Sequence, residues 1–301
     1  MTTRHRRNGM LGAGMALAVL TAGCAAEASA GDDGLEVMAS FSPLVFVAQR
    51  VAGEDAQVTN LTPAGSDPHN LELSPAKFGQ LQEADLIVYL SGLQPATDDA
   101  VALLDVPVVD TADAAHADTP GGAGAEELPD AGSDPHFWLD PMRLAWAGHQ
   151  VADALAELEP EHASQYRDRA SALEEELAQL DDEFADALKP CADATVVTSH
   201  EAFGYLAARY NLNQVGIAGV DPEVEPSPAR LREVMAVVEE TGVRTIFFEV
   251  NATQKMAERL ADELGVGTDV LDPMERPSDD DYVRVMRANL EALTRGLVCD
   301  G

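Results

Sequence analysis

The sequence predicts an α/β fold in which two doubly wound parallel sheets are joined by one long helix. Short apolar runs alternate with helical segments in residues 35–110, and the alternation returns in residues 195–296. Strands separated by helices form parallel sheets that helices cover on both faces. Residues 142–188 keep a helical spacing of apolar residues almost throughout. We therefore expect α/β lobes at 35–141 and 189–301, joined by a helix at 142–188.

The first half contains four expected strands and three helices. The strands are predicted at residues 35–40, 57–61, 85–90 and 106–110. The helices are predicted at residues 42–52, 74–83 and 96–104. Ser42-Pro43 and Ser74-Pro75 open the first two helices, because serine caps a helix N-terminus and proline is tolerated in the first turn. Residues 111–132 lack periodicity and are rich in Ala, Gly, Asp and Pro, which is typical of a surface loop.

The linking helix leads into a second half with the same alternation. Glu159-Pro160 is expected to interrupt or kink the link, because proline breaks a helix interior. Apolar residues of the link recur at three- and four-residue spacing, at Leu173, Leu177, Leu180, Phe184 and Leu188. Strands are predicted at residues 195–199, 214–218, 245–250 and 268–271. Helices are predicted at residues 201–210, 227–241, 253–264 and 280–296.

The first residues have the pattern of a signal peptide, which we place at residues 1–23. A basic segment, Arg4-His5-Arg6-Arg7, precedes an apolar run at residues 10–20 that is too short to span a bilayer comfortably. The rest of the chain is therefore expected to lie outside the cytoplasm.

Cys24 directly follows the predicted signal peptide. The small residues before it resemble a bacterial lipobox, although the leucine usual three places before the cysteine is Thr21 here. Acylation would anchor the chain to the membrane through Cys24, and residues 24–34 would form a flexible, small and acidic tether. Ordinary secretion with cleavage at another position is the alternative.

Acidic residues outnumber basic ones by 53 to 19, which gives a net charge of −34. A chain this acidic repels phosphate backbones, so nucleic acid is excluded as an expected partner. The charge keeps the surface solvated, and its field attracts cations. A field alone creates no specific metal site.

Cys191 and Cys299 are the two cysteines of the expected body of the protein. An exported chain with two such cysteines is expected to join them in a disulfide bond. Neither lies in a Cys-x-x-Cys pair or beside a histidine, so the alternative of a cysteine metal ligand fits poorly.

The pentapeptide Gly-Ser-Asp-Pro-His occurs twice, at residues 65–69 and 132–136. Gly and Pro fix a tight turn, and Ser and Asp can accept hydrogen bonds from nearby backbone N–H groups. Each copy therefore presents a histidine, His69 or His136. A third histidine, His200, follows the apolar strand predicted at 195–199.

These histidines and Asp272 are expected at one cleft. His200 and Asp272 lie at carboxyl ends of strands in the second sheet, while His69 and His136 border the first sheet; ligands gather at such ends. Three imidazoles and one carboxylate make a tetrahedral zinc set. The spacing is unlike that of a zinc finger, and a single histidine is more often a satisfied core residue. The residues alone leave open whether the four side chains meet.

The segments around these positions resemble a known family. Asp134-Pro135-His136-Phe137-Trp138-Leu139-Asp140-Pro141, Ser199-His200-Glu201-Ala202-Phe203-Gly204-Tyr205-Leu206 and Leu271-Asp272-Pro273 are similar to the metal-binding substrate-binding proteins of zinc and manganese ABC importers. Glu223-x-Glu225-Pro226-Ser227 and Phe247-Phe248-Glu249 match further family segments. The resemblance runs through nearly the whole mature chain. It implies two α/β lobes, one long connecting helix and a metal between the lobes.

The resemblance implies that His69, His136, His200 and Asp272 are the metal ligands. Members with a carboxylate at the third position tend toward manganese, so His200 favours zinc, with manganese kept open. Some zinc-type members also have a disulfide in the second lobe, which suits the two cysteines. Many carry a histidine-rich loop before the second ligand, whereas the loop here holds only His116.

Glu249 stands at a strand end, where we expect it to orient a ligand imidazole, with the role of fourth ligand as its alternative.

The predicted function is a monomeric receptor, not an enzyme, that binds Zn(II) as its substrate and delivers it to an ABC permease and its ATPase. A secreted zinc hydrolase is the rival from another class, with water as fourth ligand and Glu249 or Glu201 as base. A third hypothesis is that the protein is a metal-linked adhesin or that it handles metal for another enzyme.

Overall fold

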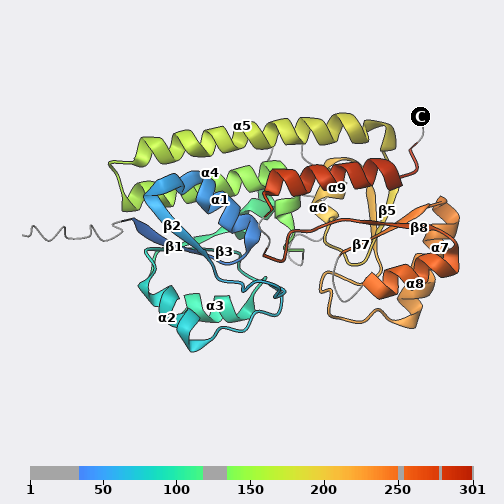
Figure 1. Ribbon diagram of the computed structural model, residues 1–301, viewed down its shortest axis with the longest axis horizontal. Helices are drawn as coiled ribbons and strands as arrows, with labels where there is room; N and C mark the ends of the chain where they lie inside the picture. The colour runs from blue at the N-terminus through green and yellow to red at the C-terminus, as the bar shows by residue number, and fades with distance from the viewer. Residues whose placement is uncertain (1–33, 118–133, 250–253, 278–279, 300–301) are drawn as a thin grey trace, which may run out of the picture. The chain divides into compact units, whose positions relative to one another are not determined.

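The fold consists of two sheets, each built from parallel strands, that are linked by a pair of helices (Figure 1). The structure, a computed structural model, describes residues 34–117, 134–249, 254–277 and 280–299. The predicted signal peptide, the lipidation site at Cys24 and nearly all of the tether lie outside these residues, as do residues 118–132 of the predicted loop. Within the described ranges, no helix has the length and apolar character needed to cross a membrane.

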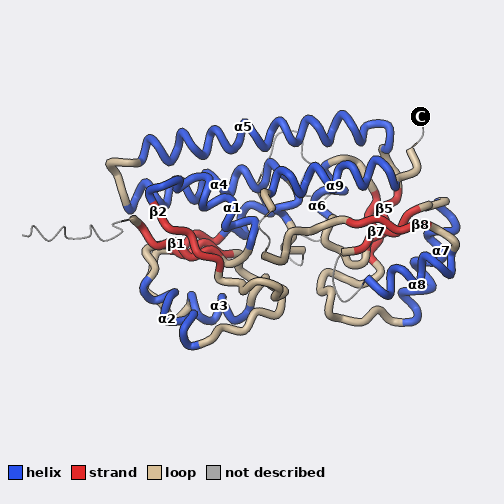
Figure 2. The backbone as a smooth tube through the Cα atoms, viewed as in Figure 1, coloured by secondary structure: helices blue, strands red, loops and turns tan. Residues whose placement is uncertain are grey.

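The first lobe contains a four-stranded sheet with helices on both faces (Figure 2). Its strands are β1 (Leu35–Ala39), β2 (Ala56–Asn60), β3 (Leu86–Tyr89) and β4 (Val108–Asp110). Its helices are α1 (Ser42–Ala52), α2 (Pro75–Glu83) and α3 (Pro95–Val101), with 3-10 turns η1 (Gly53–Asp55), η2 (Thr111–His116) and η3 (Phe137–Leu139). The strand order is β2-β1-β3-β4 and all pairs are parallel.

The second lobe repeats this plan. Its strands are β5 (Thr195–Thr198), β6 (Asn213–Gly216), β7 (Thr245–Phe248) and β8 (Gly267–Val270). Its helices are α6 (Gly204–Arg209), α7 (Pro228–Thr241), α8 (Gln254–Leu264) and α9 (Tyr282–Gly296). The strand order β6-β5-β7-β8 matches that of the first sheet position by position, again with parallel pairs only. The predicted fold class is confirmed.

The link is two helices rather than one. Helix α4 (Pro141–Leu158) ends just before Glu159-Pro160, and α5 (Ala163–Leu188) runs back beside it, followed by the 3-10 turn η4 (Lys189–Cys191) (Figure 1). The prediction of a single helix over 142–188 is therefore wrong. Pro160 lacks a backbone N–H and cannot continue a helix interior, so the kink that the sequence indicated is a complete reversal.

Helix α5 contacts both lobes. Its Glu176 pairs with Arg50 of α1, and its Glu183 pairs with Arg287 of α9 at 2.7 Å. The apolar stripe predicted for this helix is buried along its whole length, at Leu173, Leu177, Leu180, Phe184 and Leu188. A helix buried against both lobes is a rigid spine.

One hydrophobic core runs through both lobes. It contains Val37 of β1 and Leu44 of α1, continues through Leu177 of α5, and reaches Tyr205 of α6 and Met286 of α9. Smaller clusters lie on the other face of each sheet, under α2 and α3 in the first lobe and under α7 and α8 in the second. Movement of one lobe against the other would therefore disturb packed core.

Buried charges also join the lobes. Asp140 caps the start of α4 by accepting hydrogen bonds from the backbone N–H groups of Met142 and Arg143. Its carboxylate lies 3.3 Å from the guanidinium of Arg209 in α6, and Arg209 donates to Asp181 of α5. Asp140 and Arg209 are each only 2% exposed, and Arg143 and Asp181 also pair with them, so removal of either would leave the other with one partner fewer in a dry interior.

The predicted disulfide joins Cys191 and Cys299. The bond connects the turn after α5 to the chain just beyond α9, and the two cysteines are 108 residues apart in the sequence. Cys191 belongs to the same core that passes through both lobes.

Serine caps two helices that begin with a Ser-Pro pair. Ser74 accepts a hydrogen bond from the backbone N–H of Lys77, and Ser227 accepts one from that of Arg230. Ser42, in contrast, is the first residue of α1 and not its cap, because Phe41 is the N-cap of this helix. The Ser-Pro pairs mark helix starts correctly to within one residue.

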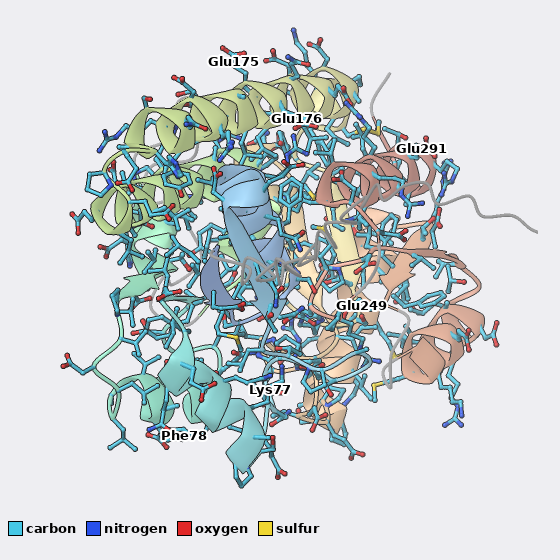
Figure 3. All side chains as sticks on the ribbon, turned by 60° about the vertical axis from the view of Figure 1, so that its left-hand side comes forward. Lys77, Phe78, Glu175, Glu176, Glu249 and Glu291 are labelled. Carbon is cyan, nitrogen blue, oxygen red and sulfur yellow. A yellow bond between two sulfur atoms is a disulfide. The ribbon has the colours of Figure 1, made fainter. Side chains whose placement is uncertain are left out.

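Exposed acidic side chains lie on the outer surface of α5 and α9. Glu175 of α5 and Glu291 of α9 are exposed and point away from the ribbon (Figure 3). This placement agrees with the expectation that the negative charge keeps the surface solvated.

The buried stripe of α5 gives a stability prediction. Leu177→Ala removes a side chain with no solvent exposure and leaves a cavity, so we expect the free energy of unfolding to fall by about 2–5 kcal/mol. Leu103→Ala, at a leucine that is 77% exposed, is the matched control and should cost less than about 0.5 kcal/mol. Urea unfolding followed by circular dichroism measures both values, and equal losses would contradict the role of α5 as a packed spine.

Candidate metal centre

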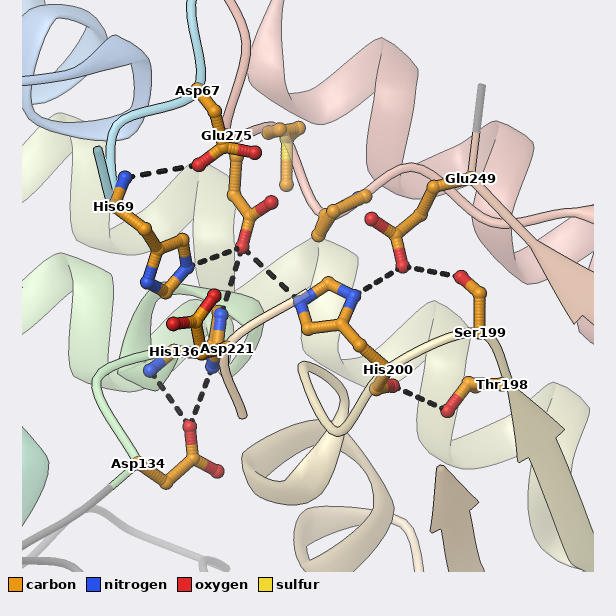
Figure 4. A network of polar contacts seen from close by, with 12 residues as sticks. Asp67, His69, Asp134, His136, Thr198, Ser199, His200, Asp221, Glu249 and Glu275 are labelled. Atoms are coloured by element: carbon orange, nitrogen blue, oxygen red, sulfur yellow. Dashed lines mark hydrogen bonds and ion pairs between the residues drawn. The ribbon is translucent and has the colours of Figure 1, made fainter. Parts of the chain in front are cut away.

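Four side chains from both lobes meet at one point: His69, His136, His200 and Glu275 (Figure 4). Each can offer a ligand atom, and these four atoms lie within 4.8 Å of one another. Three of the four are buried, and His69 is 10% exposed. The structure thus brings together the three histidines that the sequence singled out.

Each lobe supplies two of these residues from loops at its sheet edge. His69 lies in the loop after β2, and His136 directly precedes η3. His200 follows β5 by two residues, and Glu275 lies in the segment after β8. The cluster therefore lies at the carboxyl ends of strands, where parallel α/β sheets place their ligands.

One oxygen of Glu275 lies at the centre of the three imidazoles. Its Oε1 is 3.1 Å from Nε2 of His69, 2.8 Å from Nε2 of His136 and 3.3 Å from Nε2 of His200. A zinc tetrahedron with bonds of 2.0–2.1 Å has edges of about 3.3 Å between ligand atoms. The nitrogen-to-oxygen distances therefore approximate the edges of such a site.

The structure places Glu275, and not Asp272, beside the histidines. The exposed Asp272 instead uses its Oδ1 to accept a hydrogen bond from the backbone N–H of Met274 at 2.7 Å. Met274 has a positive φ of 58°, which reverses the chain between the two acids. The expectation that Asp272 joins the cluster is corrected on this geometry.

The sequence contained a signal for this difference. Asp-Pro pairs favour turns, in which the aspartate side chain bonds to backbone two residues ahead, as Asp272 does here. Glu275 comes three residues later and its side chain is one methylene longer. If Asp272 is interpreted as a turn-former, Glu275 is the next carboxylate along the chain that could contact the three histidines.

Carboxylates behind two of the histidines fix the orientation of their rings. Nδ1 of His136 donates to Oδ1 of Asp134 at 2.7 Å. Nδ1 of His200 donates to Oε1 of Glu249 at 2.5 Å, and the same oxygen accepts a hydrogen bond from Ser199 Oγ. Glu249 thus contacts the ring of His200 on the side away from Glu275, a position from which it can orient this imidazole. Such partners set the tautomer and make the opposite nitrogen a better metal ligand.

These contacts leave Nε2 as the free nitrogen, aimed at the Glu275 carboxylate. A neutral imidazole that donates through Nδ1 has a lone pair on Nε2, and a lone pair facing a carboxylate oxygen is repulsive. Nε2 of His200 lies at 3.3 Å without hydrogen-bond geometry. Only a cation between nitrogen and oxygen, either a proton or a metal, makes this arrangement favourable.

The pKa values express the same preference for a cation. Burial alone would lower the pKa of His200, but its contacts with Glu249 and Glu275 outweigh burial and raise the pKa to about 10. Burial likewise opposes a raised pKa at His136, where hydrogen bonds to Asp134 and Glu275 prevail. Burial would raise the pKa of Glu275, yet its hydrogen bonds to the histidines hold that pKa well below its usual range.

The two copies of the pentapeptide use their aspartates differently. Asp67 accepts a hydrogen bond from the backbone N–H of His69 at 3.0 Å, as expected of a turn-former. Asp134 makes the equivalent bond to the backbone of His136 and also contacts that ring. Gly132 and Ser133 of the second copy lie outside the described residues.

Comparison with known proteins gives this site a family. A family profile described as "Zinc-uptake complex component A periplasmic" matches residues 37–296. The chain belongs to this family. The match confirms the resemblance found in the sequence, and it covers both lobes together with the helices between them.

Individual relatives agree with this assignment. The chain is 35% identical over 278 residues to "Zinc-binding lipoprotein AdcA" of Streptococcus pneumoniae, covering 87% of this chain and 56% of the relative. It therefore spans about half the length of that relative. A crystal structure of the Zn(II)-bound ZnuA-like domain of AdcA from this organism aligns with a TM-score of 0.73 and 33% identity, covering 89% of this chain and all of the domain.

A third likeness is to the laminin-binding protein Lmb of Streptococcus agalactiae. The structures align with a TM-score of 0.78 and 33% identity, covering 87% of this chain and 99% of Lmb. That structure is described as a bifunctional protein with adhesin and metal transporting activity.

The placement of Glu275 and Asp272 yields a direct test of the fourth ligand. Glu275→Gln removes the buried negative charge at the centre of the cluster, so zinc affinity should fall at least about 100-fold. Asp272→Asn keeps an oxygen that can accept from Met274, so its affinity should change less than about threefold. Competition with a chromophoric chelator measures both. If zinc affinity falls more in Asp272→Asn than in Glu275→Gln, Asp272 is the fourth metal ligand.

Proposed function

We propose that this chain is an extracytoplasmic receptor that binds Zn(II) as its substrate for delivery to an ABC importer. The observation that carries the proposal is the convergence of three imidazole nitrogens on one carboxylate oxygen, with carboxylates behind two of the rings. This geometry is unfavourable without a cation, and three nitrogens with one oxygen are a preferred zinc set. Membership of the zinc-uptake family supports the same conclusion.

The donor set favours zinc over manganese. Imidazole is a better ligand for zinc, whereas manganese prefers carboxylate, carbonyl and water oxygens. Selection by donor type is only partial, because affinities also depend on how rigidly the ligands are held. Here Asp134 and Glu249 restrain two of the rings, which suits zinc, because closed protein sites hold this ion with four ligands in a tetrahedron.

The same geometry argues against the alternative function of a secreted zinc hydrolase. A catalytic zinc keeps one position open for water or substrate, whereas a site with four protein ligands is closed. Glu275 lies in the fourth position, at 2.8–3.3 Å from each of the three nitrogens. Glu249, one base proposed for that rival, is engaged with His200 and Ser199 behind the site. We therefore propose a binding protein that performs no reaction.

Capture and delivery follow from the division of the ligands between lobes. Zinc reaches the site most readily past His69, which is the only ligand of the four with appreciable exposure. Both lobes must be in place for four ligands to act together, so docking on a permease could release the ion by disturbing one pair. The acidic surface raises the local concentration of cations and aids capture.

Attachment to the membrane through an acylated Cys24 belongs to this proposal. A relative that is 35% identical is described as a lipoprotein, and the chain has the small residues before Cys24 that acylation requires. A tethered monomer with its permease and ATPase is the arrangement we infer.

Zinc binding should depend on pH in a distinctive range. The metal-free protein keeps protons on imidazoles whose pKa values are raised, to about 10 at His200, and zinc must displace them. Apparent affinity should therefore still rise about tenfold per displaced proton between pH 7 and pH 8. Histidines with an ordinary pKa near 6.5 would give little change in zinc affinity between pH 7 and pH 8. Calorimetry in buffers of different ionisation enthalpy should detect the released protons; equal affinity at both pH values would contradict this.

The function itself is tested with histidine variants. His200→Ala should lower zinc affinity by orders of magnitude while the fold remains, because the other core residues are unchanged. His149→Ala is the matched control, since this histidine is 40% exposed and pairs with Glu174 on the link helices. Metal analysis of the purified protein and competition between zinc and manganese complete the measurement. Wild-type affinity in a folded His200→Ala protein would overturn the proposal.

Delivery requires a test in cells. Deletion of the gene should slow growth under zinc starvation, and wild-type protein but not the His200→Ala variant should restore it. Normal growth of the deletion strain would favour the adhesin or metal-handling alternatives.

A further inference from the structure

The turn that carries Glu275 is held from outside by side chains of both lobes. Asn289 of α9 pairs with both backbone groups of Asp272, donating to its carbonyl and accepting from its N–H at 2.8 Å each. From the first lobe, the indole Nε1 of Trp138 donates to the backbone carbonyl of Pro273 at 2.7 Å. The backbone two residues before Glu275 is therefore fixed by a residue of the opposite lobe.

Trp138 contacts both lobes, so it can fix the position of the Glu275 turn relative to the first lobe. Its side chain is fully buried, and its ring packs edge-on against Phe41 with centroids 4.7 Å apart. The imidazole of His136 lies 5.1 Å from the same ring, tilted by 56°. The backbone carbonyl of Trp138 accepts a hydrogen bond from the hydroxyl of Tyr282 in the second lobe. One residue thus contacts a zinc ligand of its own lobe and is bonded twice to the other lobe.

The turn needs such support because its backbone is strained. Met274 has a φ of 58°, in the left-handed region that non-glycine residues rarely occupy. A residue in this region persists only when its surroundings determine it. Loss of the bond at Pro273 would let the turn relax, and Glu275 would move with it.

We propose that Trp138 is a positioning residue that holds Glu275 at the three histidines through its indole N–H. This inference rests on the proposed zinc function and identifies what sets the affinity of that same site. Packing alone would require only an aromatic ring at position 138. The N–H adds a bond between the lobes whose acceptor lies two residues from a ligand, so the zinc site is complete only when this bond is made.

The test is a double-mutant cycle on zinc affinity. Trp138→Phe keeps an aromatic ring and removes the donor, and it should weaken zinc binding about tenfold, with most of the change in the dissociation rate. In a Glu275→Ala background the same substitution should change affinity less than about twofold, because the group it positions is absent. Equal losses in both backgrounds would show that Trp138 acts through packing on His136 and would overturn the inference.

The other tryptophan supplies the matched control. The chain has two tryptophans, and Trp146 lies partly buried on α4. Trp146→Phe should leave zinc affinity unchanged. An unaltered affinity in Trp138→Phe would overturn the inference while leaving the proposed function intact, whereas a wild-type chain without zinc affinity would overturn both.

A measurement on an intact site covers the case in which Trp138→Phe fails to fold. In the Trp146→Phe protein the single indole N–H signal belongs to Trp138 and can be followed by NMR. Zinc should slow its hydrogen exchange at least tenfold, because opening the turn would then also require breaking the bond between Glu275 and the metal. An exchange rate that zinc does not change would overturn the inference.

Discussion

The convergence of three imidazole nitrogens on the carboxylate of Glu275 imposes the main requirement on this fold. Two of these four side chains come from each lobe, and contacts of 2.8–3.3 Å tolerate little displacement between them. The lobes must therefore be held in register by something stiffer than a flexible linker. A core shared through α5, the buried pair of Asp140 and Arg209, and the Trp138 bond to Pro273 each meet this requirement in a different way.

These three connections differ in how they would respond to movement. The shared core resists any separation of the lobes, because opening it exposes apolar surface. The Asp140–Arg209 pair resists more sharply, since separating the two charges removes part of the compensation that each has in a dry interior. A hydrogen bond to one backbone carbonyl is the weakest of the three. Movement of the 272–275 turn alone would therefore cost less free energy than rotation of a whole lobe.

Sequence reasoning reached most of the fold because each lobe obeys local rules. Alternating apolar strands and Ser-Pro helix starts gave element boundaries within a few residues, and the same logic found His69, His136 and His200. It failed where a tertiary effect decided the outcome. The reversal at Pro160 depends on α5 finding a partner surface on α4. The choice of Glu275 depends on the turn that follows Asp272; the Asp-Pro pair indicates such a turn, but the left-handed φ of Met274 does not follow from its residue type.

The disulfide has a consequence that reaches beyond its own neighbourhood. It fastens the chain just after α9 to the turn after α5, and α9 carries Asn289, which grips the backbone of Asp272. In a reducing compartment this covalent link would be absent, and α9 would be held only by its packing in the core and by its side-chain contacts, including those of Asn289 with the turn that bears Glu275.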